Sequence, residues 1–198
     1  MQRQVIVFSD VRYSRIEYNQ AMPASWKQPS LKAQDLLVVL KISISSPKDL
    51  TFSRLSNDLH MSVSEAHAAV KRATQSRLLT NAGERLAVSR VALREFVLHG
   101  VPYAFPPLFG GLTRGVPTGA WAPPLNSKFD TQNDLPHVWP DPEGSVRGVS
   151  LCPLYPSVPS AAALSMRLYE LLSLIDALRA GAARERELAI KTLGEEYL

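Results

Sequence analysis

The sequence predicts an α+β fold that is mainly α, and three observations support this class. Apolar residues recur at helical spacing over 33–44, over 52–73 and again from 164 to 198. Two short strand-like segments flank Asn81-Ala82-Gly83, which predicts a hairpin. Twelve of the 15 prolines lie between residues 101 and 160, so that region cannot form long helices and is expected to hold short strands.

The composition indicates a folded protein without a membrane segment. The chain has 198 residues, of which 45% are hydrophobic and 20% are charged. No run approaches the ~20 apolar residues that span a bilayer, and Asp10 and Arg12 interrupt the start, which excludes a signal peptide. The single cysteine, Cys152, fits a reducing compartment and is expected to be a buried small hydrophobe. We therefore expect a cytoplasmic protein.

Positive charge is concentrated in the N-terminal half. Residues 32–100 hold ten Lys/Arg against six acids, which gives +4, whereas residues 101–198 hold eight against ten, which gives −2. Residues 1–31 add +2, for a total of +4. This asymmetry favours an anionic partner, such as nucleic acid, for the N-terminal half.

We divide the chain into three parts. Residues 1–30 are expected to form an irregular N-terminal arm, in which Val5–Phe8 is a candidate strand and Met22 is a candidate native start. Residues 31–99 form one predicted domain of helices and a hairpin. Residues 100–198 form a Pro-rich and helical C-terminal domain, expected to serve oligomerisation or the binding of a partner or effector.

The 31–99 segment predicts three helices in succession. The first covers Ala33 to Ile44, and the second follows Thr51, a suitable N-cap. The third begins with Ser62-Val63-Ser64-Glu65, which has the form of a capping box. Its inward stripe is predicted to contain Val63, Ala66, Val70 and Ala73.

A hairpin and a fourth helix are predicted next. Leu78–Thr80 and Arg85–Val88 are the two strands, and the helix is expected over Ser89–Leu98, with Val91, Leu93, Phe96 and Val97 available for packing. In the C-terminal half, a short strand is expected around Ser145–Leu151. Helix resumes near Ser160 with a leucine stripe from Leu164 to Leu178, ends at Gly181, and continues over 182–198. We interpret the leucine stripe as core or as a dimer seam.

The order of these elements resembles the winged helix-turn-helix of bacterial transcriptional regulators of the MarR/IclR kind, and the match centres on residues 50–73. In this family the second helix carries a small residue near its middle, here Ser56, so that the third can cross it closely. The turn between them usually holds glycine. This chain has His60 there, a residue that adopts positive φ more readily than most.

The resemblance implies that the third helix is a recognition helix whose first turns reach base edges in the major groove of double-stranded DNA. Lys71 and Arg72, one turn later, are placed to contact guanine or phosphate. Arg85 in the hairpin is the expected wing contact. The candidate DNA-binding residues are Ser62, Ser64, His67, Ala68, Lys71, Arg72, Gln75 and Arg85.

The C-terminal half shows a second resemblance. The segments Phe96–Pro106, Gly110–Gly115, Val138–Gly144 and Leu154–Pro159, with two later helical stretches, look like AbiEi-type antitoxins. Those proteins join a winged helix to a second domain and are encoded beside nucleotidyltransferase-type toxins. The resemblance implies a toxin partner and autoregulation of the operon.

No catalytic set is expected. The four histidines lack metal-ligand spacing, and one cysteine cannot supply a zinc cluster. Gly110-Gly111 lacks the lysine and the following helix of a phosphate-binding loop. We therefore expect no enzyme, no metal and no cofactor.

Three functions remain open from the sequence. The first is a transcriptional regulator that binds double-stranded DNA, as a homodimer that reads two half-sites. The second is an antitoxin that neutralises a protein partner. The third is a winged-helix protein-interaction module that does not bind DNA.

Overall fold

The computed structural model describes residues 30–46, 50–82, 85–129 and 134–198, and it is α+β and mainly helical, as the sequence predicts. The predicted N-terminal arm and its Val5–Phe8 strand lie outside the described residues. The helices and strands in chain order are α1 (Ala33–Ile44), α2 (Phe52–Asp58), α3 (Val63–Gln75), β1 (Leu79–Ala82), β2 (Arg85–Val88), α4 (Arg90–Glu95), α5 (Val101–Ala104), β3 (Phe109–Pro117), β4 (His137–Pro140), β5 (Val146–Leu151), α6 (Val158–Ala163), α7 (Met166–Ala180) and α8 (Ala183–Thr192).

The first three helices form where the sequence predicts them, and the hairpin forms with a shifted first strand, because β1 begins at Leu79 and continues past the predicted end at Thr80 to Ala82. The Thr51 hydroxyl accepts from the Arg54 amide and begins α2. Ser62 and Glu65 form the reciprocal capping box that begins α3. His60 has a φ of 47°, which confirms the left-handed turn between α2 and α3. Strands β1 and β2 pair antiparallel, with Leu79 opposite Val88.

The fourth predicted helix is longer than expected and packs differently. It continues from α4 through a π-helical turn (Phe96–Gly100) into α5, past the predicted end at Leu98. The chain stays helical across Pro102, which lies in the first turn of α5 directly after the π-helical turn. Leu93 and Val97 are buried, but Val91, which we expected to pack, is 76% exposed.

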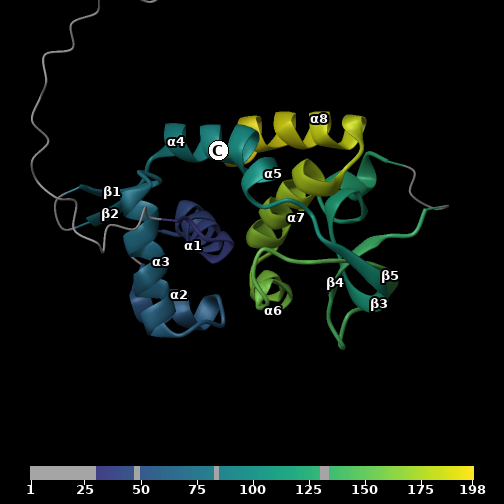
Figure 1. Cartoon of the computed structure of the whole chain (residues 1–198), viewed down its shortest axis with the longest axis horizontal. Helices are drawn as coiled ribbons and strands as arrows, with labels where there is room; N and C mark the ends of the chain where they lie inside the picture. The colour runs from purple at the N-terminus through teal and green to yellow at the C-terminus, as the bar shows by residue number, and fades with distance from the viewer. Residues whose placement is uncertain (1–29, 47–49, 83–84, 130–133) are drawn as a thin grey trace, which may run out of the picture.

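The Pro-rich region contains a small closed three-stranded sheet (Figure 1). Strand β3 pairs antiparallel with both β4 and β5, and β4 pairs parallel with β5. The strand predicted around Ser145–Leu151 is β5. Gly115 and Gly148 allow the strands to approach, since a Cβ on either would overlap the carbonyl oxygen of Trp139 or Pro136.

The C-terminal helices differ from the prediction at one position. The leucine stripe is buried along α7, but Leu164 is 61% exposed because the chain turns there, between α6 and α7. Gly181 ends α7, as expected. After α8 a π-helical turn, Leu193–Tyr197, brings the C-terminus beside α4, where Arg90 donates to the Tyr197 carbonyl (Figure 1).

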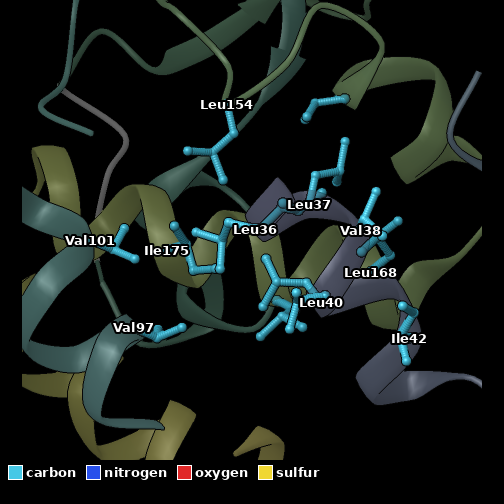
Figure 2. Close-up of a cluster of buried hydrophobic side chains, with 14 of the residues drawn as sticks. Leu36, Leu37, Val38, Leu40, Ile42, Val97, Val101, Leu154, Leu168 and Ile175 are labelled. Atoms are coloured by element: carbon cyan, nitrogen blue, oxygen red, sulfur yellow. The ribbon is translucent and has the colours of Figure 1, made fainter. Parts of the chain in front are cut away.

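Helix α1 lies at the centre of the core. Leu36, Leu37 and Leu40 have no exposed surface, because α3 and the hairpin cover one side of α1 and α7 covers another. Figure 2 shows these leucines close to Leu168 and Ile175 of α7. Most of the buried hydrophobic side chains of the described residues form a continuous cluster that includes both halves of the chain.

A buried polar network fixes the three-stranded sheet to α7. The Asp176 carboxylate accepts from the Thr118 hydroxyl at 2.8 Å and from the Trp139 indole at 2.6 Å. It also pairs with Arg179 at 2.6 Å. Arg179 in turn donates to the carbonyls of Phe105, Pro106 and Cys152. Because each of these groups is partnered, the network holds the strands in one position on the helix.

Candidate nucleic-acid interface

The outer surface of α3 carries a stripe of small and polar side chains. Ser64, Lys71 and Gln75 are exposed and Ala68 is partly exposed. Their spacing of four, three and four residues places them on one helix face. Ala66, Ala69, Val70 and Ala73 are buried on the opposite face. In Figure 1, α3 lies at the end of the molecule that also carries the β1–β2 hairpin.

The side of α3 next to α2 is built by aromatic stacking. The His67 imidazole lies on the Phe52 ring of α2, with 3.5 Å between ring centroids and 18° between planes. This fixes His67 at the edge of the stripe while leaving the residue exposed. Val63 was predicted to face inward but is 46% exposed. It is the first helical residue, so it lies beyond the end of the core.

Arg72, a candidate DNA contact, is engaged by α1. Its guanidinium donates to both oxygens of the Asp35 carboxylate, at 2.8 and 2.6 Å. The Asp35 side chain has no exposed surface, and that of Arg72 is 21% exposed. Hydrogen bonding to Asp35 raises the pKa of Arg72. The geometry therefore gives Arg72 a structural partner, which its position on the helical wheel did not reveal.

The first turn of α3 contacts the C-terminal half, which sequence reasoning missed. Glu65 accepts from the backbone amide and hydroxyl of Ser62, at 2.8 Å each, and from the Tyr155 hydroxyl at 2.9 Å. These hydrogen bonds lower the pKa of Glu65. Burial and the bond to Glu65 raise the pKa of Tyr155. Ser157 donates to the Leu59 carbonyl at the end of α2. Two residues of the C-terminal half therefore bond to residues on either side of the turn between α2 and α3.

Two further basic residues follow α3 in the chain. Arg77 is exposed directly after α3, with a φ of 60°, and sequence reasoning missed it; its position between helix and hairpin was the available signal. Arg85 begins β2, but its side chain lies outside what the structure describes, so the expected wing contact remains a prediction. Ser62 is exposed at the N-cap, with its hydroxyl bonded to Glu65.

The remaining residues considered for catalysis or metal binding are Cys152 and the potential metal ligands. Cys152 is exposed, which corrects the expectation that it is buried; it follows β5, outside the sheet. Among the described residues, His, Cys, Asp and Glu form no group of three that would hold a metal ion. Within the same part of the chain, none of the helices has the length and apolarity needed to cross a membrane.

Comparison with known proteins gives no relative. No family model, no curated protein and no solved structure matches this chain.

Proposed function

We propose that the chain is a transcriptional regulator that binds double-stranded DNA by placing α3 in the major groove. The observation that carries this proposal is the exposed stripe of Ser64, Ala68, Lys71 and Gln75, which lies directly opposite the buried face of the same helix. We interpret α1–α3 with the β1–β2 hairpin as a winged helix-turn-helix, in which α3 is the recognition helix.

The side chains of the stripe suit a helix that enters a groove. Ser64 and Ala68 are small, so the helix backbone can approach the base edges. Gln75 has an amide that pairs with adenine, and Lys71 has a cation that pairs with guanine or phosphate. Exposed Arg77, and Arg85 at the start of β2, add cations for the neighbouring DNA phosphates.

In this proposal Arg72 is a positioning residue. Its bidentate pair with Asp35 ties α3 to α1, and the His67–Phe52 stack ties α3 to α2. Tyr155 holds the first turn through Glu65. The stripe is therefore presented by a helix fixed on three sides, which lowers the entropic cost of binding. A homodimer with two such helices would read two half-sites.

A fluorescence-anisotropy titration tests the proposal. The full chain is titrated into labelled duplex DNA taken from upstream of its own coding sequence, at several salt concentrations. We expect binding that weakens steeply with salt, because lysine and arginine displace condensed counterions. Lys71→Ala with Gln75→Ala is expected to weaken binding by about tenfold or more, since a well-formed base contact contributes about 1–3 kcal/mol.

The matched control is Arg186→Ala with Lys191→Ala, which removes exposed cations from α8. This control is expected to bind like the wild type. No binding at low salt, or equal loss in the control and the α3 variant, would contradict the groove assignment.

A further inference from the structure

A second surface lies at the other end of the molecule, on the three-stranded sheet (Figure 1). Three large apolar side chains are exposed there: Phe109 at 51%, Leu112 at 54% and Leu135 at 59%. Leu112 lies opposite Val149 on β5, and the Phe109 ring lies 5.0 Å from the His137 ring of β4. Leu135 precedes Pro136, whose carbonyl accepts from the Val149 amide. These contacts place the three apolar side chains around one part of the sheet.

Two arginines continue this surface. Arg114 of β3 and Arg147 of β5 are direct cross-strand partners, so their side chains leave the same face of the sheet as Leu112. Both are exposed, and neither forms an ion pair with an acid among the described residues. Like charges directly opposite each other are unfavourable. They border a groove of about 430 Å³, which also touches Leu112, Thr113, Ser145 and Val146.

The local chemistry selects the kind of occupant. Paired guanidinium groups bind carboxylates or phosphates through bidentate hydrogen bonds. Asp141 and Glu143 lie on the turn beside Arg114, and they would repel a phosphodiester chain that is negative along its whole length. A peptide, in contrast, can place carboxylates at the arginines and aliphatic groups at the leucines. Large apolar side chains exposed near one another are typical of sites of protein interaction.

The backbone offers an extended segment a further set of contacts. Over Phe109–Thr113, β3 pairs with β5 along one edge, whereas β4 joins β3 only at Gly115–Pro117. Although the sheet closes through the pairing of β4 with Gly115–Pro117, no strand of the described residues pairs with the other edge of Phe109–Thr113. Edge strands of this kind accept an added strand in peptide recognition.

We propose that this surface, formed by Phe109, Leu112, Arg114, Leu135 and Arg147, binds an acidic protein segment that carries apolar side chains. The arginines take its carboxylates and the leucines take its apolar groups. The surface lies away from α3, so a bound segment leaves the proposed DNA-binding stripe uncovered (Figure 1).

Selection from a display library of short random peptides on the immobilised full chain tests the proposal. We expect the enriched peptides to combine Asp or Glu with Leu, Ile or Phe. When they are synthesised and titrated by fluorescence anisotropy, Arg114→Glu with Arg147→Glu is expected to reduce their affinity by about tenfold or more. Repeating the selection on that variant is expected to enrich basic peptides instead.

Control variants test whether peptide binding depends on the proposed surface. Arg186→Glu with Lys191→Glu on α8 is expected to leave the affinity for the selected peptides unchanged. Leu112→Ser is expected to weaken that affinity. If the glutamate variant is misfolded by circular dichroism, Arg114→Gln with Arg147→Gln replaces it. No enrichment, enrichment without acidic residues, or peptides indifferent to these substitutions would overturn the proposal.

Two further results would also overturn it. The first is binding of oligonucleotides that depends on Arg114 and Arg147 but not on Lys71. The second is concentration-dependent self-association, measured by sedimentation, that Leu112→Ser abolishes, which would make the surface an interface between copies of the chain. Loss of DNA binding at α3 would leave the peptide result unaffected, so the two proposals fail separately.

Discussion

Asp35 shows at the residue scale how one buried charge organises a helix surface. Its carboxylate accepts from the Lys32 amide at 2.8 Å, which begins α1, and from the Arg72 guanidinium, which anchors α3. A carboxylate without exposed surface needs such partners, because its desolvation is otherwise uncompensated. The same residue therefore caps one helix and sets the position of another.

Replacing Arg72 with Met is expected to reduce the free energy of unfolding by about 3 kcal/mol, because it leaves a buried carboxylate without its cation. This expected loss lies at the low end of the range for breaking a buried ion pair, because the Arg72 side chain is 21% exposed. Urea unfolding followed by circular dichroism measures the change. Asp35→Asn combined with Arg72→Met is expected to recover part of the loss, and a double variant no more stable than Arg72→Met would contradict this explanation.

His137 makes the stability depend on pH. Burial lowers its pKa below the ordinary value of 6.5, although nearby Glu185 and Asp176 partly oppose the shift. The unfolded chain therefore binds a proton more readily than the folded chain. The stabilisation is fully present above pH 6.5 and is lost as the pH falls from 6.5 through the folded-state pKa.

Thermal unfolding between pH 8 and 5 tests this prediction. His137→Phe is expected to lose less stability on acidification than the wild type, and His99→Gln, which alters an exposed histidine, is expected to behave like the wild type. Equal pH dependence in the wild type and His137→Phe would refute the assignment.

At the scale of elements, close backbone approaches decide the three-stranded sheet. A side chain on Gly148 would overlap the Pro136 carbonyl oxygen, whereas a Cβ on Gly111 would meet nothing within 4 Å. Gly111 lies in β3, and Gly148 lies in its partner strand β5. Gly148 is buried at a regular pairing position, whereas Gly111 is exposed at the irregularity between Phe109 and Leu112.

Gly148→Ala is therefore expected to destabilise the protein by about 1–3 kcal/mol, the usual cost of inserting atoms into a packed site. Gly111→Ala is expected to change the free energy of unfolding little. Thermal unfolding of the two variants measures the difference, and similar melting temperatures would show that the sheet adjusts to the added methyl group.

For the whole molecule, α1 makes the stability of each half of the chain depend on the other half. Its leucines are covered by α3 on one side and by α7 on the other, within a continuous cluster. The C-terminus also returns to α4. We therefore expect one cooperative unfolding transition for the part of the chain that shares this core.

Leu37→Ala is expected to reduce stability by about 2–5 kcal/mol, the range for emptying a fully buried leucine site. Native-state hydrogen exchange is expected to show loss of protection in both α3 and α7, because both helices pack against α1. Loss confined to one of these helices would instead indicate two separately folding units.

The sequence predicted much of the local structure, and particular residues explain why. Thr51 and the Ser62–Glu65 capping box specify helix starts through contacts within three residues, and both were confirmed. His60 has the predicted left-handed conformation for the same local reason. Of the candidate site, the exposure of Ser64, Lys71 and Gln75 follows from helical periodicity alone.

Long-range packing decided the rest. The bond from Tyr155 to Glu65 joins residues 90 positions apart, and the pair between Arg72 and Asp35 joins residues 37 apart. No local pattern specifies either contact. The exposure of Leu164 likewise depends on where α6 ends and α7 begins.

The sequence by itself therefore determined the class of the fold, the helix caps, the hairpin and the outward stripe of α3, because each arises from forces between neighbouring residues. Only the tertiary structure decided that Arg72 faces α1, that α1 is shared by both halves, and that Arg114 meets Arg147 beside exposed leucines. Those outcomes depend on which distant surfaces bury one another, since burial and pairing in space are properties of the folded chain.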